Sequence, residues 1–179
     1  MNGPKEITPR RYADHRGYFS ETYSRKHYAK MGVDVDFVQD NHSLSRAVGT
    51  LRGLHFQVFP RPQEKLVRCG RGAIFDVAVD IRRGSPNYGQ WYGYQLTAEN
   101  GHQLYVPVGF AHGFMTLEPD SEIVYKCSDY YAPETEGAVH WNSCGINWPL
   151  SQDPILSDKD AAAPPLSDFV SPFIYGENS

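Results

Sequence analysis

Two histidines and one glutamate in this sequence have side chains that could hold a metal ion. His55 is the first residue of the triplet HFQ, His112 ends the segment Gly-x5-Pro-x-Gly-x2-His of residues 101–112, and Glu64 lies between them in the chain. Two imidazoles and a carboxylate can form the facial triad that binds iron(II). Two histidines alone are fewer protein ligands than zinc or iron sites usually have. A metal site therefore competes with histidines that make only structural hydrogen bonds.

A group of cations could hold an anionic ligand. Residues 50–71 contain one acid, Glu64, and five basic residues, which are Arg52, Arg61, Lys65, Arg68 and Arg71. The planar fork of arginine makes bidentate contacts with phosphate oxygens, so a diphosphate is a suitable ligand class. Arg61 and Arg71 can equally be isolated surface charges.

The composition is that of a globular protein of one domain. The chain has 179 residues and a formal net charge of −4, with 15 Lys and Arg against 10 Asp and Glu in residues 1–117 and 2 against 11 in the remainder. Nucleic-acid binding is not expected, because polyanion binders need a strong basic excess. No apolar stretch has the length of a signal peptide core or a membrane span. The three cysteines lack zinc spacing, so we expect reduced thiols and a cytoplasmic protein.

The elements that must position these residues are mostly strands. Stretches rich in β-branched and aromatic residues predict strands at 36–44, 50–57, 64–69, 73–81, 90–97, 102–106, 111–117 and 121–129. Apolar residues alternate strictly with Asp76, Ala78 and Asp80 within residues 75–81. Short helices are expected only at 25–31 and 157–163. The pattern predicts an all-β sandwich or barrel, in a single domain over residues 1–179.

The segment that ends at His112 resembles the second conserved motif of the cupin superfamily, whose members are small jelly-roll barrels. In metal-binding cupins the first motif supplies a His-x-His pair and a glutamate. Here the corresponding triplet is His55-Phe56-Gln57, so Gln57 occupies the position of the second histidine. A His55/His112/Glu64 triad is still conceivable, but this substitution weakens the case for a bound metal.

Six separated motifs resemble those of the dTDP-4-dehydrorhamnose 3,5-epimerase family, in the same order. They are residues 37–43 (FVQDNHS), 50–57 (TLRGLHFQ), 65–68 (KLVR), 75–82 (FDVAVDIR), 107–114 (PVGFAHGF) and 158–161 (DKDA). The resemblance runs from residue 14 to residue 160. It implies an all-β cupin jelly-roll barrel with short flanking helices, which works as a homodimer without metal or organic cofactor. It also implies that the N-terminal strands contribute to the dimer and that residues 150–179 pack beside the barrel.

The resemblance assigns catalytic roles to four residues. The implied reaction inverts C3 and C5 of dTDP-4-dehydro-6-deoxy-D-glucose through an enolate, so it needs a base, an acid on the opposite face and a cation at the developing oxyanion. By family position His55 is the base, Asp160 orients it, Lys65 lies at the enolate oxygen and Tyr125 is the acid. Without the resemblance, each of these would be read as packing or surface residues.

The resemblance also assigns residues to substrate binding. Arg52 and Arg16 are expected at the diphosphate, with Arg16 donated by the partner subunit. Contacts with the sugar or thymine are expected from Phe19, Glu21, Gln39, Asn41, Ser43 and His112. One departure stands beside the catalytic lysine, where Glu64 replaces the family's usual glycine and could alter substrate preference.

Four functions remain in competition at this point. The leading hypothesis is the 3,5-epimerase. A sibling epimerase acting at one carbon, or on another 4-keto nucleotide sugar, would keep much the same motifs. A metal-dependent cupin oxygenase or isomerase and a non-catalytic sugar-binding cupin belong to other classes.

The spacing of Arg52 and His55 makes a structural prediction. Strict alternation places residues three apart on opposite faces of a strand. If both side chains line one pocket, the strand needs an extra residue between them. Gly53 is the natural place for it, so we predict a β-bulge at Gly53.

Overall fold

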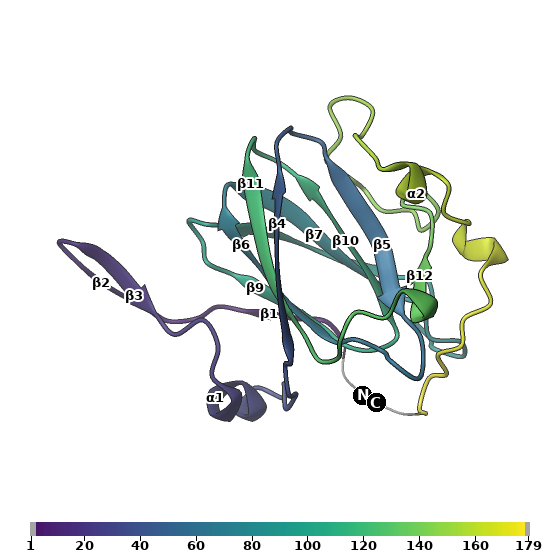
Figure 1. The fold of residues 1–179 in the computed structure, drawn as a ribbon, viewed down its shortest axis with the longest axis horizontal. Coiled ribbons are helices and arrows are strands. Elements are labelled where there is room, and N and C mark those ends of the chain that lie inside the picture. The colour runs from purple at the N-terminus through teal and green to yellow at the C-terminus, as the bar shows by residue number, and fades with distance from the viewer. Residues whose placement is uncertain (1–2, 178–179) are drawn as a thin grey trace.

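Two antiparallel five-stranded sheets face each other in the computed structural model, which describes residues 3–177 (Figure 1). In the first sheet the strand order is β1 (Lys5–Ile7), β9 (Gln103–Val106), β6 (Lys65–Arg71), β11 (Ser121–Cys127) and β4 (Gln39–Ser45). In the second the order is β12 (Glu136–Ala138), β5 (Leu51–Gln57), β10 (Phe110–Thr116), β7 (Ala73–Asp80) and β8 (Trp91–Thr97). The predicted all-β jelly-roll class is confirmed.

The eight predicted strands are all present, with boundaries shifted by a few residues at most. The two predicted helices are α1 (Arg25–Lys30) and α2 (Asp158–Ala161). Strands β1 and β12 were missed, as were β2 (Arg11–Asp14), β3 (Gly17–Ser20) and the one-turn 3-10 helices η1 (Pro133–Thr135) and η2 (Leu166–Asp168). Each of these elements has only three or four residues, which is too short to show a hydrophobic period.

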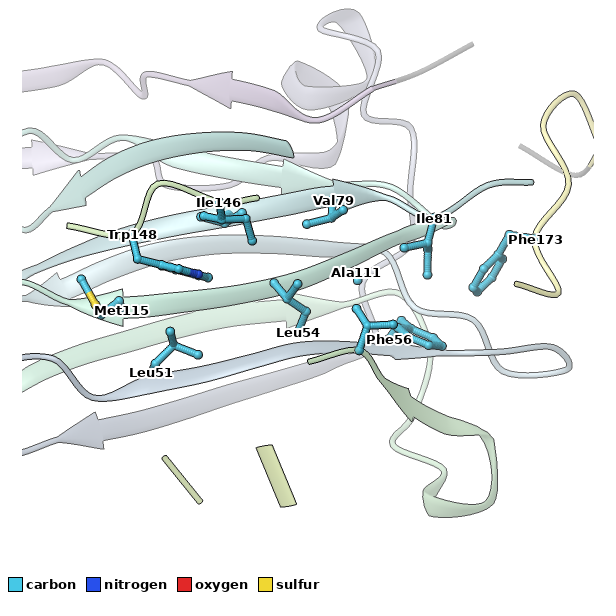
Figure 2. Packing of buried hydrophobic residues seen from close by; sticks show 12 residues of the cluster. Leu51, Leu54, Phe56, Val79, Ile81, Ala111, Met115, Ile146, Trp148 and Phe173 are labelled. Carbon is cyan, nitrogen blue, oxygen red and sulfur yellow. The ribbon is translucent and has the colours of Figure 1, made fainter. Parts of the chain in front are cut away.

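The apolar side of β7 faces away from the barrel interior. Val77 and Val79 pack with residues of the C-terminal segment (residues 139–177), including Ile146, Trp148 and Phe173. Figure 2 shows Val79 together with these three residues. Ala78, on the other face of β7, packs inside the barrel with strands of the first sheet. The C-terminal segment therefore covers the outer face of the second sheet, and the charged residues of the alternating run point inward.

The barrel interior is divided into an apolar part and a polar part. Buried apolar side chains from both sheets fill one part, including Val67, Leu104 and Ile123 from the first sheet and Ile74 and Leu96 from the second. The other part is lined by polar and charged residues of β4, β5, β6, β10 and β11. The candidate site lies in this polar part.

The N-terminal hairpin of β2 and β3 extends away from the barrel (Figure 1). It carries three large aromatic side chains that are more than half exposed, Tyr12 at 54%, Tyr18 at 58% and Phe19 at 70%. Burial of such aromatic surface is a usual source of association energy.

Across residues 3–177, the structure contains no helix with the length and apolar character of a membrane span.

A β-bulge interrupts the pairing of β5 with β10 at Gly53. His55 lies opposite His112 and Arg52 lies opposite Phe114, so Gly53 and Leu54 together face Gly113. After this extra residue, Arg52 and His55 both line one cavity. The predicted bulge is confirmed.

Only glycine fits at this bulge. Gly53 has a φ of +126°, and a Cβ atom there would lie 2.5 Å from Gly113 Cα and 2.8 Å from the His112 carbonyl oxygen. Both contacts are with backbone atoms, which cannot move aside as the end of a flexible side chain can.

We expect Gly53→Ala to destabilise the fold by about 3 kcal/mol or more, because backbone strain and overpacking each cost about 1–3 kcal/mol. The matched control is Gly84→Ala, since Gly84 has a φ of +81° but open space around its Cβ position. The control isolates the strain and should cost about 1–2 kcal/mol. Urea unfolding of both variants measures the difference, and equal losses would contradict the backbone contact at Gly53.

Candidate active site

The centre of the polar part is a hydrogen bond between His55 and Asp160. His55 Nε2 lies 2.5 Å from Asp160 Oδ1, and the Asp160 side chain is only 4% exposed. A carboxylate accepts hydrogen bonds, so Nε2 carries the proton and Nδ1 is the free basic nitrogen of the neutral ring. The arrangement fixes the imidazole for proton transfer.

Helix α2 holds Asp160 in place. The Ser157 hydroxyl donates to Asp160 Oδ2 at 2.8 Å and accepts from the Asp160 backbone N–H at 3.2 Å, so it caps the helix. Burial by itself would raise the pKa of Asp160, but hydrogen bonds from His55, Ser157 and the Gly53 backbone outweigh it and hold this pKa below its usual value. The carboxylate therefore stays ionised beside His55 at neutral pH.

Lys65 brings a cation to the same cavity from the opposite sheet. Burial lowers the pKa of Lys65, and the nearby acidic groups of Cys127, Asp76 and Glu136 offset this effect only in part. Within the described part of the chain, no carboxylate lies within 4.0 Å of the Lys65 amine to form an ion pair with it. This amine can bind an oxygen atom of a ligand.

Tyr125 lies beside Lys65 on the inner face of the first sheet. The Lys65 Nζ atom is 6.0 Å from the centroid of the Tyr125 ring. The pairing of β11 with β4 and β6 places Tyr125 in a row with Asn41 and Val67, next to the row of Cys127, Gln39 and Lys65. Burial raises the pKa of Tyr125, so the phenol is protonated at neutral pH and can act as an acid.

A second histidine–carboxylate pair lies behind the cavity. His112 Nε2 is 2.8 Å from Asp76 Oδ1, and both residues are buried. Asp76 Oδ2 has no hydrogen-bond partner among residues 3–177. The His112 ring is thereby oriented toward the cavity that it lines with His55.

The possible metal triad is not assembled. Glu64 precedes Lys65 on an extended chain, so the two side chains point to opposite faces of the sheet. The Tyr105 hydroxyl donates to Glu64 Oε2 at 2.7 Å outside the barrel, and burial raises the Glu64 pKa. No group of three or more potential metal ligands occurs among the residues that the structure describes. Glu64 was expected to stand beside the catalytic lysine, where it could alter substrate preference, but its carboxylate points away from the cavity.

The cavity has two adjoining parts that share His55, Lys65 and Tyr125. The larger has a volume of about 410 Å³ and is also lined by Arg52, Ser43 and His112. The smaller has about 280 Å³ and is also lined by Gln39 and Asn41. The fold thus brings nine of the twelve predicted site residues together around the cavity walls, which are Gln39, Asn41, Ser43, Arg52, His55, Lys65, His112, Tyr125 and Asp160. Gln57 of the histidine motif, which was not predicted as a site residue, lines the smaller part as well.

Three predicted binding residues lie elsewhere within this chain. Arg16 is in the tip of the extended hairpin and pairs with Asp14 at 2.6 Å. Phe19 and Glu21 line a different hollow, beside the hairpin and α1. A single chain therefore does not place these three residues in the cavity.

Several residues of the cavity walls were missed by the sequence reasoning. Glu136 pairs with Lys159 at 2.5 Å and accepts from the Tyr131 hydroxyl at 3.0 Å, which joins two walls of the cavity. No motif in the sequence predicts these contacts. Ser157 had a usable signal, because Ser157 and Asp160 have the spacing of a capping box. Asp76, behind the cavity, also had one, because it is a charged residue inside a buried strand.

Comparison with known proteins gives consistent matches over most of the chain. A profile of the dTDP-4-dehydrorhamnose 3,5-epimerase family matches residues 1–168. The enzyme of that name from Sinorhizobium fredii is 52% identical over 173 residues, which cover 96% of this chain and 89% of the relative.

Solved structures of similar proteins have the same fold. The Bacillus anthracis enzyme of the same name, with TDP and PPi bound, has a TM-score of 0.88 and 48% identity and covers 90% of this chain and 93% of its own. The dTDP-6-deoxy-D-glucose-3,5-epimerase of Legionella pneumophila, in complex with dTDP-4-keto-L-rhamnose, has a TM-score of 0.89 and 47% identity, with coverages of 93% and 89%.

The lowered pKa of Asp160 predicts a pH-dependent contribution to stability. A carboxyl group whose pKa is lower in the folded state stabilises the fold above its unfolded pKa of about 3.9, and this contribution is lost as the pH falls through the folded value. Asp160→Asn should therefore be less stable than the unsubstituted protein at pH 7, and the difference should shrink below about pH 4. Urea unfolding over this pH range measures it. Asp153→Asn, at an exposed position of the same segment, is the control. A difference that does not vary with pH would contradict the assignment.

Proposed function

This chain belongs to the dTDP-4-dehydrorhamnose 3,5-epimerase family, and from that premise we propose that its cavity inverts C3 and C5 of dTDP-4-dehydro-6-deoxy-D-glucose to form dTDP-4-dehydro-L-rhamnose. The activity belongs to dTDP-rhamnose biosynthesis. One observation carries the proposal for the site: an oriented base on β5 and a protonated phenol on β11 line one cavity from two facing sheets.

The reaction uses the acidity of hydrogens next to a carbonyl group. C3 and C5 both neighbour the C4 carbonyl, so loss of either proton gives an enolate. His55 Nδ1 takes the proton, and Asp160 stabilises the imidazolium that forms. The Lys65 ammonium stabilises the negative charge on O4, where a water-poor site strengthens the interaction. Tyr125 then donates a proton to the other face of the carbon, which inverts its configuration.

The diphosphate of the substrate is assigned to Arg52. Its guanidinium lies at the cavity and is held by bonds from Nε to Ser45 Oγ and from Nη2 to the Leu44 carbonyl, both 3.2 Å long. These bonds leave other N–H groups of the fork for phosphate oxygens. Gln39, Asn41, Ser43 and His112 supply polar contacts for the sugar and the thymine base.

We propose that the protein acts as a homodimer in which the β2–β3 hairpin reaches the partner's cavity. The hairpin extends away from its own barrel, and its exposed aromatic residues would be buried by such an exchange. Arg16, Phe19 and Glu21 would then complete the partner's site, which explains why they lie away from the cavity of their own chain.

The proposed reaction needs no metal or organic cofactor. The ring nitrogens at Nε2 of His55 and His112 are already committed to Asp160 and Asp76, and Glu64 faces away. The carbonyl group of the substrate itself supplies the acidity of the transferred protons.

We place the reaction in the cytoplasm. Cys69, Cys127 and Cys144 are all free thiols, as expected in a reducing compartment.

Turnover in D₂O tests the reaction and its two main residues. NMR should show deuterium at both C3 and C5 of the product, whereas exchange at one carbon would indicate a sibling epimerase. His55→Asn should lower the exchange rate at both positions by about 10²–10⁴-fold, the usual effect of losing a general base. Tyr125→Phe should retain exchange but lose inversion, because only the opposite-face acid is removed. Unchanged exchange in His55→Asn would show that the base is wrongly assigned.

Mixing two inactive variants tests the exchanged hairpin. Arg16→Ala and His55→Asn each damage both sites of a homodimer. In a mixed dimer both substitutions fall in one site, if Arg16 crosses, and the other site is intact. Co-refolded variants should therefore regain up to about a quarter of the unsubstituted activity, since half of the dimers are mixed and each has one good site. Two variants at the same cavity, His55→Asn and Asp160→Asn, are the control and should regain none. No recovery in the first mixture, with dimers formed, would contradict crossing.

A further inference from the structure

Gln57 is a buried amide whose hydrogen-bonding groups are all used by two surface loops. Its side chain is 4% exposed, and Nε2 donates to the carbonyls of Arg61 at 2.7 Å and Tyr130 at 3.2 Å. Its Oε1 accepts from the Ala132 N–H at 3.0 Å. It lies two residues after His55, on the same face of β5, where metal-binding cupins have their second histidine.

The segment that Gln57 holds forms a wall of the smaller part of the cavity. Residues 129–132 lie in the connection between β11 and η1, and Tyr131 in this segment is 57% exposed and lines the cavity. The segment has no strand partner. Other side chains that hold it are Gln39, which accepts from the Tyr131 N–H at 2.9 Å, and Gln63, which donates to the Asp129 carbonyl at 2.7 Å.

Only an amide can make the bonds found at Gln57. The position requires two donors and one acceptor, which glutamine supplies. A glutamate could accept from Ala132 but would place a charge against two carbonyl oxygens. A neutral histidine has one donor and one acceptor, so the cupin residue would leave one of these two carbonyls without its partner.

We infer that Gln57 is a positioning residue that fixes the 129–132 wall for binding of the nucleotide sugar. The inference rests on the proposed function, and it concerns binding rather than proton transfer. The bonds of Gln57 end on this wall and on the neighbouring loop at Arg61, and none of them reaches His55, Lys65 or Tyr125. Loss of the bonds should therefore weaken substrate binding while the proton-transfer groups keep their geometry.

Two variants of similar side-chain size test the inference. Gln57→Met removes all three bonds, and Gln57→Glu removes both donors. In each we expect KM for the 4-keto nucleotide sugar to rise about tenfold or more, with kcat within about threefold of the unsubstituted enzyme, because uniform binding is lost. The dissociation constant of dTDP, measured by calorimetry, should rise in parallel. Gln63→Met removes a different bond to the same segment and should shift KM in the same direction if the Gln57 variants do not fold.

The matched control is Val79→Ala, a cavity in the apolar core away from the site, chosen to lower Tm to a similar extent. It should leave KM and dTDP affinity unchanged. A fall in kcat with unchanged KM in the Gln57 variants would overturn the inference, as would unchanged dTDP affinity. An unsubstituted protein that binds dTDP but does not epimerise the sugar would instead contradict the proposed function, and the dTDP measurement would still decide the role of Gln57.

Discussion

The hydrogen bond between His55 and Asp160 joins the two halves of this molecule. His55 lies on a barrel strand, and Asp160 lies 105 residues later in a short helix of the segment that covers the second sheet. A buried carboxylate is costly unless it is paired and hydrogen-bonded. The same contact therefore orients the His55 imidazole and requires the C-terminal segment to be docked correctly. The bulge at Gly53 serves this contact, because it turns His55 toward the cavity and its backbone stabilises the Asp160 charge.

The inward direction of Asp76 and Asp80 on β7 and of His112 on β10 explains how a small barrel has both a core and a site. Much of the hydrophobic burial occurs outside the barrel, between the second sheet and the C-terminal segment (Figure 2). The interior is thus free to hold polar groups at one end. There, Asp76 is paired with His112, and Lys65 faces the cavity without an ion-pair partner among the described residues.

Much of the fold and part of the site could be predicted from the sequence. Strands with a clear period were found, and the spacing of Arg52 and His55 was enough to predict the bulge, since parity on a strand is a geometric rule. The short strands β1, β2, β3 and β12 carry no period and depend on neighbours distant in sequence. For the same reason the Glu136–Lys159 pair could not be predicted. The face on which Glu64 lies could have been predicted, because it follows from alternation along the extended chain next to Lys65.

The long separation in sequence between His55 and Asp160 also determines the order in which they become available during synthesis. His55 is synthesised well before Asp160, so a nascent chain that has folded most of its barrel still lacks the carboxylate that orients the His55 ring. Under the proposed mechanism, proton transfer therefore begins only when the C-terminal segment has emerged and docked. Activity is therefore gained late in the folding of a newly made chain. Recovery of turnover during refolding would report on the docking of the C-terminal segment rather than on formation of the sheets.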